Sequence, residues 1–269
     1  MTQEHNQTTQ LEYDKLLVET AVAAGEIMLV SGAEIYRVED TVGRILSMDT
    51  KRQAENVALG TSLIVTLDRP GEESLTIMRR IRNRSTNLNR VCRANEVSRR
   101  LCAKAMGLSE ARDTLKIIKT ENQYGDFTKA VGYIGVSAFF ALLLGGTWKE
   151  GLGAGIAGLF LAVVCLLTAK VRLNDFCMNA LGAFAVGFAS LAVENWVIAG
   201  MDGNAVITGA IMPLVPGVTF TTAIRDILNG DYSSGTSRMM EALVVALSVA
   251  VGIGTAMTIF GKMMGGAGV

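Results

Sequence analysis

The second half of the chain contains five apolar stretches that are each long enough to cross a lipid bilayer as a helix. The hydrocarbon core is ~30 Å thick and needs about 20 apolar residues per helix. Residues 1–126 carry most of the charge, whereas Ala, Val, Leu and Gly dominate residues 127–269. We therefore expect an α-helical integral membrane protein with a small soluble α+β domain over 1–126 and a membrane domain over 127–269. The five predicted transmembrane helices cover residues 128–147, 151–169, 176–199, 205–227 and 239–261.

The distribution of basic residues among the loops predicts the orientation of these helices. Lys and Arg are enriched in loops that stay on the cytoplasmic side, and the polar first ten residues do not form a signal peptide. We therefore expect a multi-pass protein of the inner (cell) membrane, with a cytoplasmic N-terminal domain and the C-terminus outside. Four basic residues favour this orientation and two oppose it: Lys170, Arg172, Arg225 and Arg238 against Lys149 and Lys262.

The N-terminal domain has patterns of both helices and strands. Hydrophobic periodicity predicts a helix over 11–30 and a second helix that runs to about residue 48. Ser31 and Glu34 have the spacing of a capping box for that second helix. Two strands are expected over 61–68 and 73–81, joined by a turn that contains Pro70 and Gly71. Two further helices, near 87–106 and 109–120, lead to the membrane domain.

Charge is unevenly distributed within this domain. Residues 79–104 hold eight arginines, Lys104 and one acid, Glu96, whereas residues 1–50 hold nine acids and three bases. The basic segment could attract RNA, anionic lipid or an anionic solute. Alternatively, it is a solvated helix face opposite the acidic first helices. Residues 79–104 contain no aromatic side chain on which bases could stack, so we expect no nucleic-acid partner.

Small residues in the second and third predicted spans are spaced for close helix packing. Gly151 and Gly155, and likewise Ala183 and Gly187, are four residues apart, and such pairs let helix backbones approach in lipid. Residues 153–158 also match GxGxxG, but no strand precedes them. We therefore do not expect dinucleotide binding there.

The residue types required for common enzyme and metal sites are scarce. The single histidine, His5, lies in the polar N-terminal tail, and no GxSxG elbow occurs in the chain. We expect no enzymatic activity, no metal and no cofactor. The four cysteines form no CxxC pair and are expected to be free thiols: Cys92, Cys102, Cys165 and Cys177.

The fourth predicted span interrupts its own helix. Each of its two prolines removes a backbone donor, and the glycine that follows adds freedom. The freed carbonyls need partners, so such a break persists in a membrane where protein or water surrounds it. We interpret this segment as a substrate path; the alternative is a kinked packing helix whose threonines bond to their own backbone. The predicted path comprises Pro213, Pro216, Gly217, Thr219, Thr221 and Thr222.

Charged residues follow this break. Pairing among them would form a gate or a structural clamp at the cytoplasmic end of the fourth and fifth spans, and a structural role is the simpler interpretation. Glu194, near the outer end of the third span, is a candidate for proton coupling, although acids at helix ends are ordinary. The predicted gate or ion-pair group comprises Arg225, Asp226, Asp231, Arg238 and Glu241.

Two segments resemble the threonine/serine exporter family: SGAEIYRVEDT over 31–41 and MPLVPGVTFTTAIRDILNGDYSSGTSRMMEA over 212–242. The resemblance extends from about Tyr13 to the end of the chain. It implies the short, split form of the family, which has five spans and works with a separate small membrane protein of the same family. Short-form relatives are associated with dicarboxylates such as succinate, and long-form relatives with threonine and serine.

Two functions are compatible with these features. The first is a subunit of a secondary exporter of small polar metabolites, either threonine and serine or dicarboxylates. Five spans would place an appended five-span block upside down, as in the inverted repeats of secondary transporters, and no Walker A motif indicates a primary pump. The alternative is a membrane-anchored regulatory or scaffolding protein with a ligand-sensing soluble domain. The expected partners are the second membrane protein, the lipid bilayer and further copies of this chain.

Overall fold

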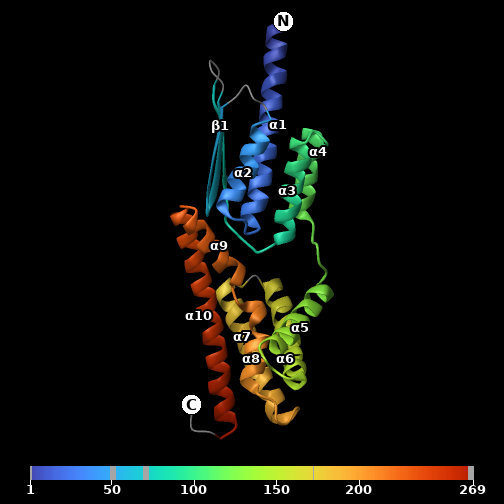
Figure 1. Cartoon of the computed structure of the whole chain (residues 1–269), viewed down its shortest axis with the longest axis vertical. Helices are drawn as coiled ribbons and strands as arrows, with labels where there is room; N and C mark the ends of the chain where they lie inside the picture. Colours follow the sequence, from blue (N-terminus) through green and yellow to red (C-terminus); the bar gives the residue numbers. More distant parts are fainter. Residues whose placement is uncertain (1, 49–52, 69–72, 172, 266–269) are drawn as a thin grey trace. The chain divides into compact units, whose positions relative to one another are not determined.

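A computed structural model describes residues 2–48, 53–68, 73–171 and 173–265 of the chain (Figure 1). The chain divides into two compact units. The first unit comprises Met1–Glu121 and Val218–Met240, and the second comprises Asn122–Gly217 and Glu241–Val269. The first unit therefore combines most of the predicted soluble domain with a segment from late in the sequence. The predicted boundary between soluble and membrane-embedded residues, at 126 and 127, stays a prediction.

The first unit has three layers, with a sheet on one side of α1 and α2 and a helical pair on the other (Figure 1). Helix α1 is central, because it contacts α2, α3, α4 and two of the strands. The core between the layers is aliphatic, with Leu17, Ile35 and Leu63 fully buried. The four helices are α1 (Thr2–Val30), α2 (Ile35–Leu46), α3 (Leu88–Cys102) and α4 (Leu108–Thr120).

The sheet is antiparallel, has the order β1-β2-β3 and contains one more strand than the sequence predicted. Strands β2 (Ser62–Asp68) and β3 (Leu75–Arg80) lie where two strands were expected. The missed strand, β1 (Gln53–Leu59), pairs with β2 from Gln53 opposite Asp68 to Leu59 opposite Ser62. Most of its side chains are exposed or half-buried, so its sequence lacks the apolar alternation that identifies a strand.

The second unit is helical and contains most of the apolar sequence. Among the described residues, four helices are long and apolar enough to cross a membrane, and the number is five if an interrupted pair, Gly203–Leu214 and Gly217–Leu228, forms one span. The elements are α5 (Asp126–Leu143), α6 (Trp148–Val171), α7 (Asp175–Trp196), α8 (Gly203–Ala210) and the short 3₁₀ helix η1 (Met212–Leu214). Helix α9 (Gly217–Leu228) follows the interruption, and α10 (Tyr232–Met263) runs from the first unit into the second.

Small residues bring the helices of the second unit close together, as their spacing predicted. A Cβ atom added to Gly158 of α6 would lie 2.6 Å from Oγ of Ser137 on α5. One added to Gly187 of α7 would lie 3.0 Å from Ala256 of α10, and one at Gly155 would lie 3.6 Å from Ala138 of α5. These glycines therefore pack against helices of this same chain, where a larger side chain would push the backbones apart.

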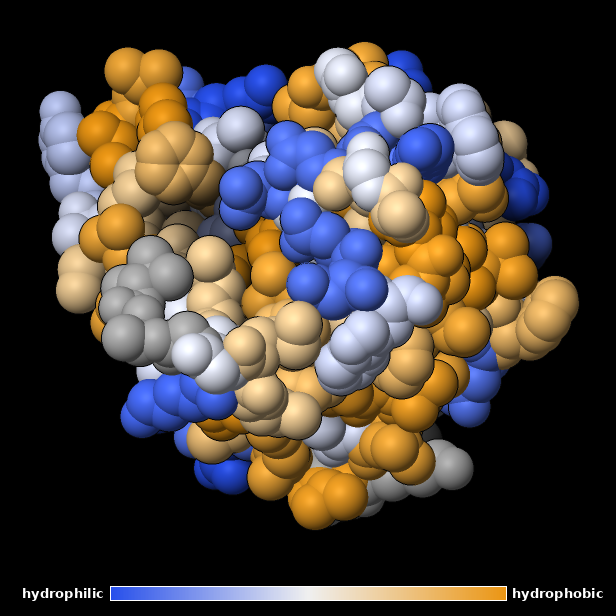
Figure 2. Space-filling model, turned by 90° about the horizontal axis from the view of Figure 1, so that it is seen from below, coloured by the Kyte–Doolittle hydropathy of each residue, from blue (hydrophilic) through white to orange (hydrophobic). Residues whose placement is uncertain are grey.

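Large apolar side chains also face outward from the second unit, and hydrophobic residues (orange) cover much of the face in Figure 2. A soluble monomer rarely exposes a contiguous apolar patch larger than a few hundred Å². Lipid tails, in contrast, suit such a surface. Six of the exposed side chains on α5 and α6 are Phe127, Phe139, Leu143, Leu159, Phe160 and Leu167.

Candidate functional site

The turn between α1 and α2 forms the base of the candidate site. Gly32 has a left-handed φ of 85°, and the Ala33 N–H donates to the Met28 carbonyl at 3.0 Å. This pattern is a Schellman motif, which ends a helix. The capping-box prediction is therefore wrong: Ser31 ends α1, and Glu34 is the N-cap of α2 without a side-chain cap.

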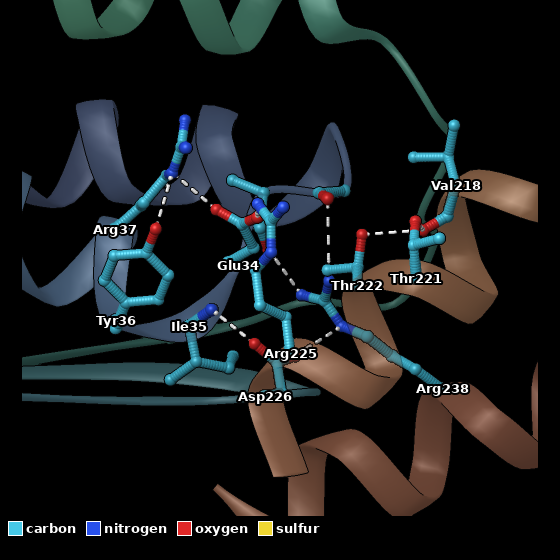
Figure 3. A network of polar contacts seen from close by, with 12 residues as sticks. Glu34, Ile35, Tyr36, Arg37, Val218, Thr221, Thr222, Arg225, Asp226 and Arg238 are labelled. Atoms are coloured by element: carbon cyan, nitrogen blue, oxygen red, sulfur yellow. Dashed lines mark hydrogen bonds and ion pairs between the residues drawn. The ribbon is translucent and has the colours of Figure 1, made fainter. Parts of the chain in front are cut away.

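A buried ion pair from α9 and α10 fixes this turn (Figure 3). Asp226 and Arg238 are 0% and 3% exposed, and Oδ2 lies 3.3 Å from Nε. Oδ1 of Asp226 accepts a hydrogen bond from the Ile35 N–H at 3.0 Å. Nη2 of Arg238 donates to the Ala33 carbonyl at 2.6 Å. The pair therefore binds the backbone on both sides of Glu34, and we call these contacts the turn clamp.

Glu34 itself contacts two arginines (Figure 3). Nη1 of Arg225 on α9 donates to Oε1, and Nε of Arg37 pairs with Oε2. Nε of Arg37 also donates to the Tyr36 hydroxyl at 3.1 Å. The Glu34 side chain is 11% exposed, whereas those of Arg37 and Arg225 are 52% and 57% exposed. One largely buried carboxylate thus neutralises part of the charge of two half-exposed guanidinium groups.

The helix interruption lies where the two prolines predicted it. Pro213 is in η1, Val215 is extended with ψ 124°, and α9 begins at Gly217, directly after Pro216. The hydroxyls of Thr221 and Thr222 donate to the Val218 carbonyl at 3.0 and 2.7 Å. Their protons are thus used within α9, as the alternative interpretation expected, but the oxygen of Thr222 keeps lone pairs that can accept a hydrogen bond. Thr219 is half-buried.

A cavity of about 310 Å³ lies among these residues. We call it the α9 cavity, and its walls come from the α1–α2 turn, α3 and the first turns of α9, all of which belong to the first unit. Its volume is at the lower end of the range for small-molecule sites. Its polar and charged lining comprises Glu34, Arg37, Thr221, Thr222 and Arg225.

The remaining predicted residues lie elsewhere. Glu194 is on α7 of the second unit, where its carboxylate packs so closely on Gly203 that a Cβ atom there would collide with it. Glu241 is in the part of α10 that belongs to the second unit. Asp231, between α9 and α10, acts on Glu39 of α2, as its charge helps to raise the pKa of that carboxyl. The predicted charged group is therefore divided among several environments.

The sequence did not single out Glu34 and Arg37 as site residues, because both fit ordinary helix-surface pairs. Glu150 was also missed. It accepts a hydrogen bond from the Thr147 N–H at 2.7 Å, in a capping box at the start of α6. Its other oxygen accepts from the Asp202 N–H at 3.0 Å. Glu150 therefore joins the start of α6 to the loop before α8.

Helix α3, which carries part of the basic segment 79–104, packs against α1 and α2, but the ion pairs of α1 run to α4. Arg93 of α3 pairs with Glu121 at 2.6 Å, whereas Glu19 and Glu26 of α1 pair with Arg112 and Lys119 of α4. The four cysteines are free thiols, as expected. Within the described ranges, no group of three His, Cys, Asp or Glu side chains could hold a metal ion.

Outward-facing apolar helices and an interrupted candidate span are features of helical membrane proteins. The family described as "Putative threonine/serine exporter" matches residues 19–260. The chain belongs to this family.

Three curated relatives are similar to the chain. The "Probable threonine/serine exporter" of Mycobacterium tuberculosis is 24% identical over 247 residues, which are 90% of this chain and 46% of that protein. The "Probable succinate transporter subunit YjjP" of Escherichia coli is 22% identical over 262 residues, 94% of this chain and 98% of that protein. "Uncharacterized protein C16A10.01" of Schizosaccharomyces pombe is 21% identical over 91% of this chain and 30% of its own length. The chain thus spans about half the length of the mycobacterial relative. No solved structure matches it.

Proposed function

We propose that this chain is a subunit of a secondary exporter that carries small polar metabolites, either threonine and serine or dicarboxylates such as succinate. The observation that carries the proposal is the break between η1 and α9 in a member of this family. Unpaired backbone at membrane depth costs several kcal/mol unless water, protein or solute satisfies it. The substrate path runs along Pro213, Pro216, Gly217, Thr219, Thr221 and Thr222.

The second half of the transporter comes from a separate small membrane protein of the same family. One comparison supports this view, since the relative from Escherichia coli is named as a subunit. A second copy of this chain is the other candidate partner. In either case the chain alone is inactive.

The transporter lies in the cell membrane, with residues 1–126 in the cytoplasm and residues 127–269 embedded as five spans. An ion or proton gradient drives export. Glu194 is the candidate coupling residue, because acids within transmembrane segments often serve proton relays. Arg225 and Glu34 form the cytoplasmic gate, and the turn clamp holds the gate's backbone in place.

Counterflow in vesicles tests this function. Vesicles that contain the chain and its partner, preloaded with unlabelled threonine, serine or succinate, should accumulate the same labelled solute. Vesicles with either protein alone should not. Absence of flux for every solute, with the complex demonstrably intact, would favour a membrane-anchored regulatory or scaffolding protein with a ligand-sensing soluble domain.

Three substitutions then test the path. Thr219→Val and Thr222→Val should alter apparent substrate affinity, and Pro216→Ala should reduce flux by closing the gap. Thr255→Val in α10 is the control, because the Thr255 hydroxyl donates to the Val251 carbonyl at 2.7 Å, as that of Thr222 does to Val218. If all three path variants match this control in flux and preference, the break is a packing kink and the path lies elsewhere.

A further inference from the structure

The α9 cavity has an excess of positive charge that its own residues do not balance. Two arginines and one glutamate line it. Within the described residues, both hydrogen-bonding contacts of Arg37 run through Nε, and its side chain lines both the α9 cavity and a neighbouring cavity that Asp40 also lines. Arg37 also carries two Nη groups. These groups are part of a planar fork that matches a carboxylate in geometry as well as in charge.

The backbone of Glu34 is fixed independently of Arg37 and Arg225. The turn clamp binds the peptide groups on both sides of it, through the Ile35 N–H and the Ala33 carbonyl. The clamp therefore keeps the backbone of Glu34 at the wall of the cavity, and the carboxylate contacts Arg225 and Arg37 there. A second carboxylate that enters must share the arginines with it.

We infer that the α9 cavity binds the carboxylate group of a small metabolite through Arg37 and Arg225, and that Glu34 is a carboxylate of the chain itself that competes for the same donors. The cavity volume, about 310 Å³, suits a molecule of a few carbon atoms. The lone pairs of the Thr222 hydroxyl can accept a hydrogen bond from a hydroxyl or ammonium group of the ligand. The inference rests on the proposed function, because in an exporter this cavity would be the site that recognises the exported acid.

Glu34 also acts on the choice between two kinds of ligand. A dicarboxylate brings two negative charges, and like charges this close repel one another. An amino acid brings an ammonium group, for which Glu34 is a partner. Removing the charge of Glu34 should therefore favour succinate over threonine.

Direct binding to the purified full-length chain tests the inference. Calorimetric titrations with succinate and with threonine, at fixed ionic strength, should be compared for the native chain and for Glu34→Gln, Arg37→Gln and Arg225→Gln. Each arginine variant should bind succinate about tenfold more weakly, since a hydrogen bond to a charged group contributes roughly that factor or more. Glu34→Gln should bind succinate about tenfold more tightly and raise the ratio of succinate to threonine affinity. Butane-1,4-diol, which has the same carbon chain without charge, should not bind.

Arg44→Gln is the matched control. Arg44 lies on the same helix as Arg37 and pairs with an acid of that helix, Asp40, at 2.9 Å, but it does not line the cavity. The Arg44→Gln variant should bind succinate and threonine with unchanged affinity. Equal weakening by Arg44→Gln and Arg37→Gln would overturn the inference, and so would unchanged or weaker succinate binding by Glu34→Gln. A gain in affinity cannot result from loss of folding. Glu34→Gln therefore tests the inference even if an arginine variant is unstable.

The outcomes of this experiment are distinct from those of the transport assay. Binding requires neither the partner nor a gradient. Carboxylate binding with the expected variant pattern, but without counterflow, would support the inference and contradict the proposed function. Counterflow with no change of succinate affinity in any of the three variants would support the proposed function and contradict the inference.

Discussion

Asp226 and Arg238 form a buried ion pair within the first unit. A charge taken out of water costs several kcal/mol, and a partner must compensate for that cost. Here each ion has the other at 3.3 Å and a backbone group of the turn in addition. Removing one member leaves the other buried without its counter-ion.

Arg238→Met should therefore lower the free energy of unfolding by about 3–5 kcal/mol. Arg44→Met is the control. The side chains of Arg44 and its partner Asp40 are both exposed, and such exposed pairs on one helix contribute about 0.3–0.5 kcal/mol. Denaturant titration of the detergent-solubilised chain measures both changes. The double variant Asp226→Leu with Arg238→Met should be less destabilised than the single variant. Equal effects of the buried and exposed substitutions would mean that the turn clamp has no structural role.

Glu39 gives a pH-dependent prediction. Its burial raises the pKa of the carboxyl above the ordinary value of 4.5, the hydrogen bond from the Ala58 N–H opposes this shift, and the charge of Asp231 adds to it. The folded chain thus holds this proton more tightly than the unfolded chain, so its stability falls as pH rises from about 4.5 through the raised pKa.

Glu39→Gln should remove this part of the pH dependence, because the amide oxygen can still accept from Ala58 but carries no charge. The variant should be more stable than the native chain above the raised pKa, and the difference should shrink as pH falls to 4.5. Unfolding curves measured between pH 4 and pH 8 give the difference directly. Glu55→Gln is the control, because it makes the same change of charge at an exposed residue of β1. If the stability difference between Glu39→Gln and the native chain were the same at every pH, the pH dependence would not come from Glu39.

At the level of residues, the sequence predicts the members of the site better than their partners. It grouped Arg225, Asp226 and Arg238, but it could not foresee that Arg225 contacts Glu34, since 191 residues separate the two. Local spacing describes helix-surface pairs well. It carries no information about which distant turn folds against a helix.

At the level of elements, long apolar helices and proline breaks were predictable. The helix expected over 109–120 matches α4, Leu108–Thr120, and the interruption follows Pro213 as expected. Strand β1 and the α1–α2 turn were not predictable in the same way. The first lacks a clear apolar face, and the second contains a serine and a glutamate at capping-box spacing although Gly32 ends the preceding helix.

The packing of α7 against α10 yields a prediction at this scale. A Cβ atom at Gly252 would collide with the Ala180 carbonyl oxygen and lie 2.8 Å from the Ala183 Cβ, whereas one at Gly254 would meet nothing within 4 Å. Gly252→Ala should therefore destabilise the chain by about 1–3 kcal/mol, as overpacking does. Gly254→Ala, two residues away on the same helix, should be neutral or slightly stabilising because alanine is the better helix former. Thermal unfolding in detergent compares them, and equal stability of the two variants would rule out the close approach.

For the molecule as a whole, the first segment that carried the family resemblance and most of the second, Val218–Met240, belong to one compact unit. Residues of 31–41 and 212–242 build the turn clamp and the contacts of Glu34. The sequence showed two separate motifs, one in each predicted domain. Their meeting explains why both are rich in charge, since a buried carboxylate or guanidinium requires a partner that the other segment supplies.

The number of spans determines the sides on which the two ends of the chain lie, and this is the last prediction. If Gly203–Leu214 and Gly217–Leu228 form one broken span, five crossings separate residue 120 from Met263, and the two positions lie on opposite sides of the membrane. If that pair does not cross, four crossings put both positions on the same side. The charged residues Arg225 and Asp226 lie near the end of α9, and basic residues favour the cytoplasmic side, so we expect five crossings. Reporters fused after Thr120, Gly200 and Met263 should therefore report cytoplasm, outside and outside. A cytoplasmic reporter after Met263, with the other two unchanged, would show that α8 and α9 enter and leave the membrane on the same side, and the inverted arrangement of the two transporter halves would no longer follow.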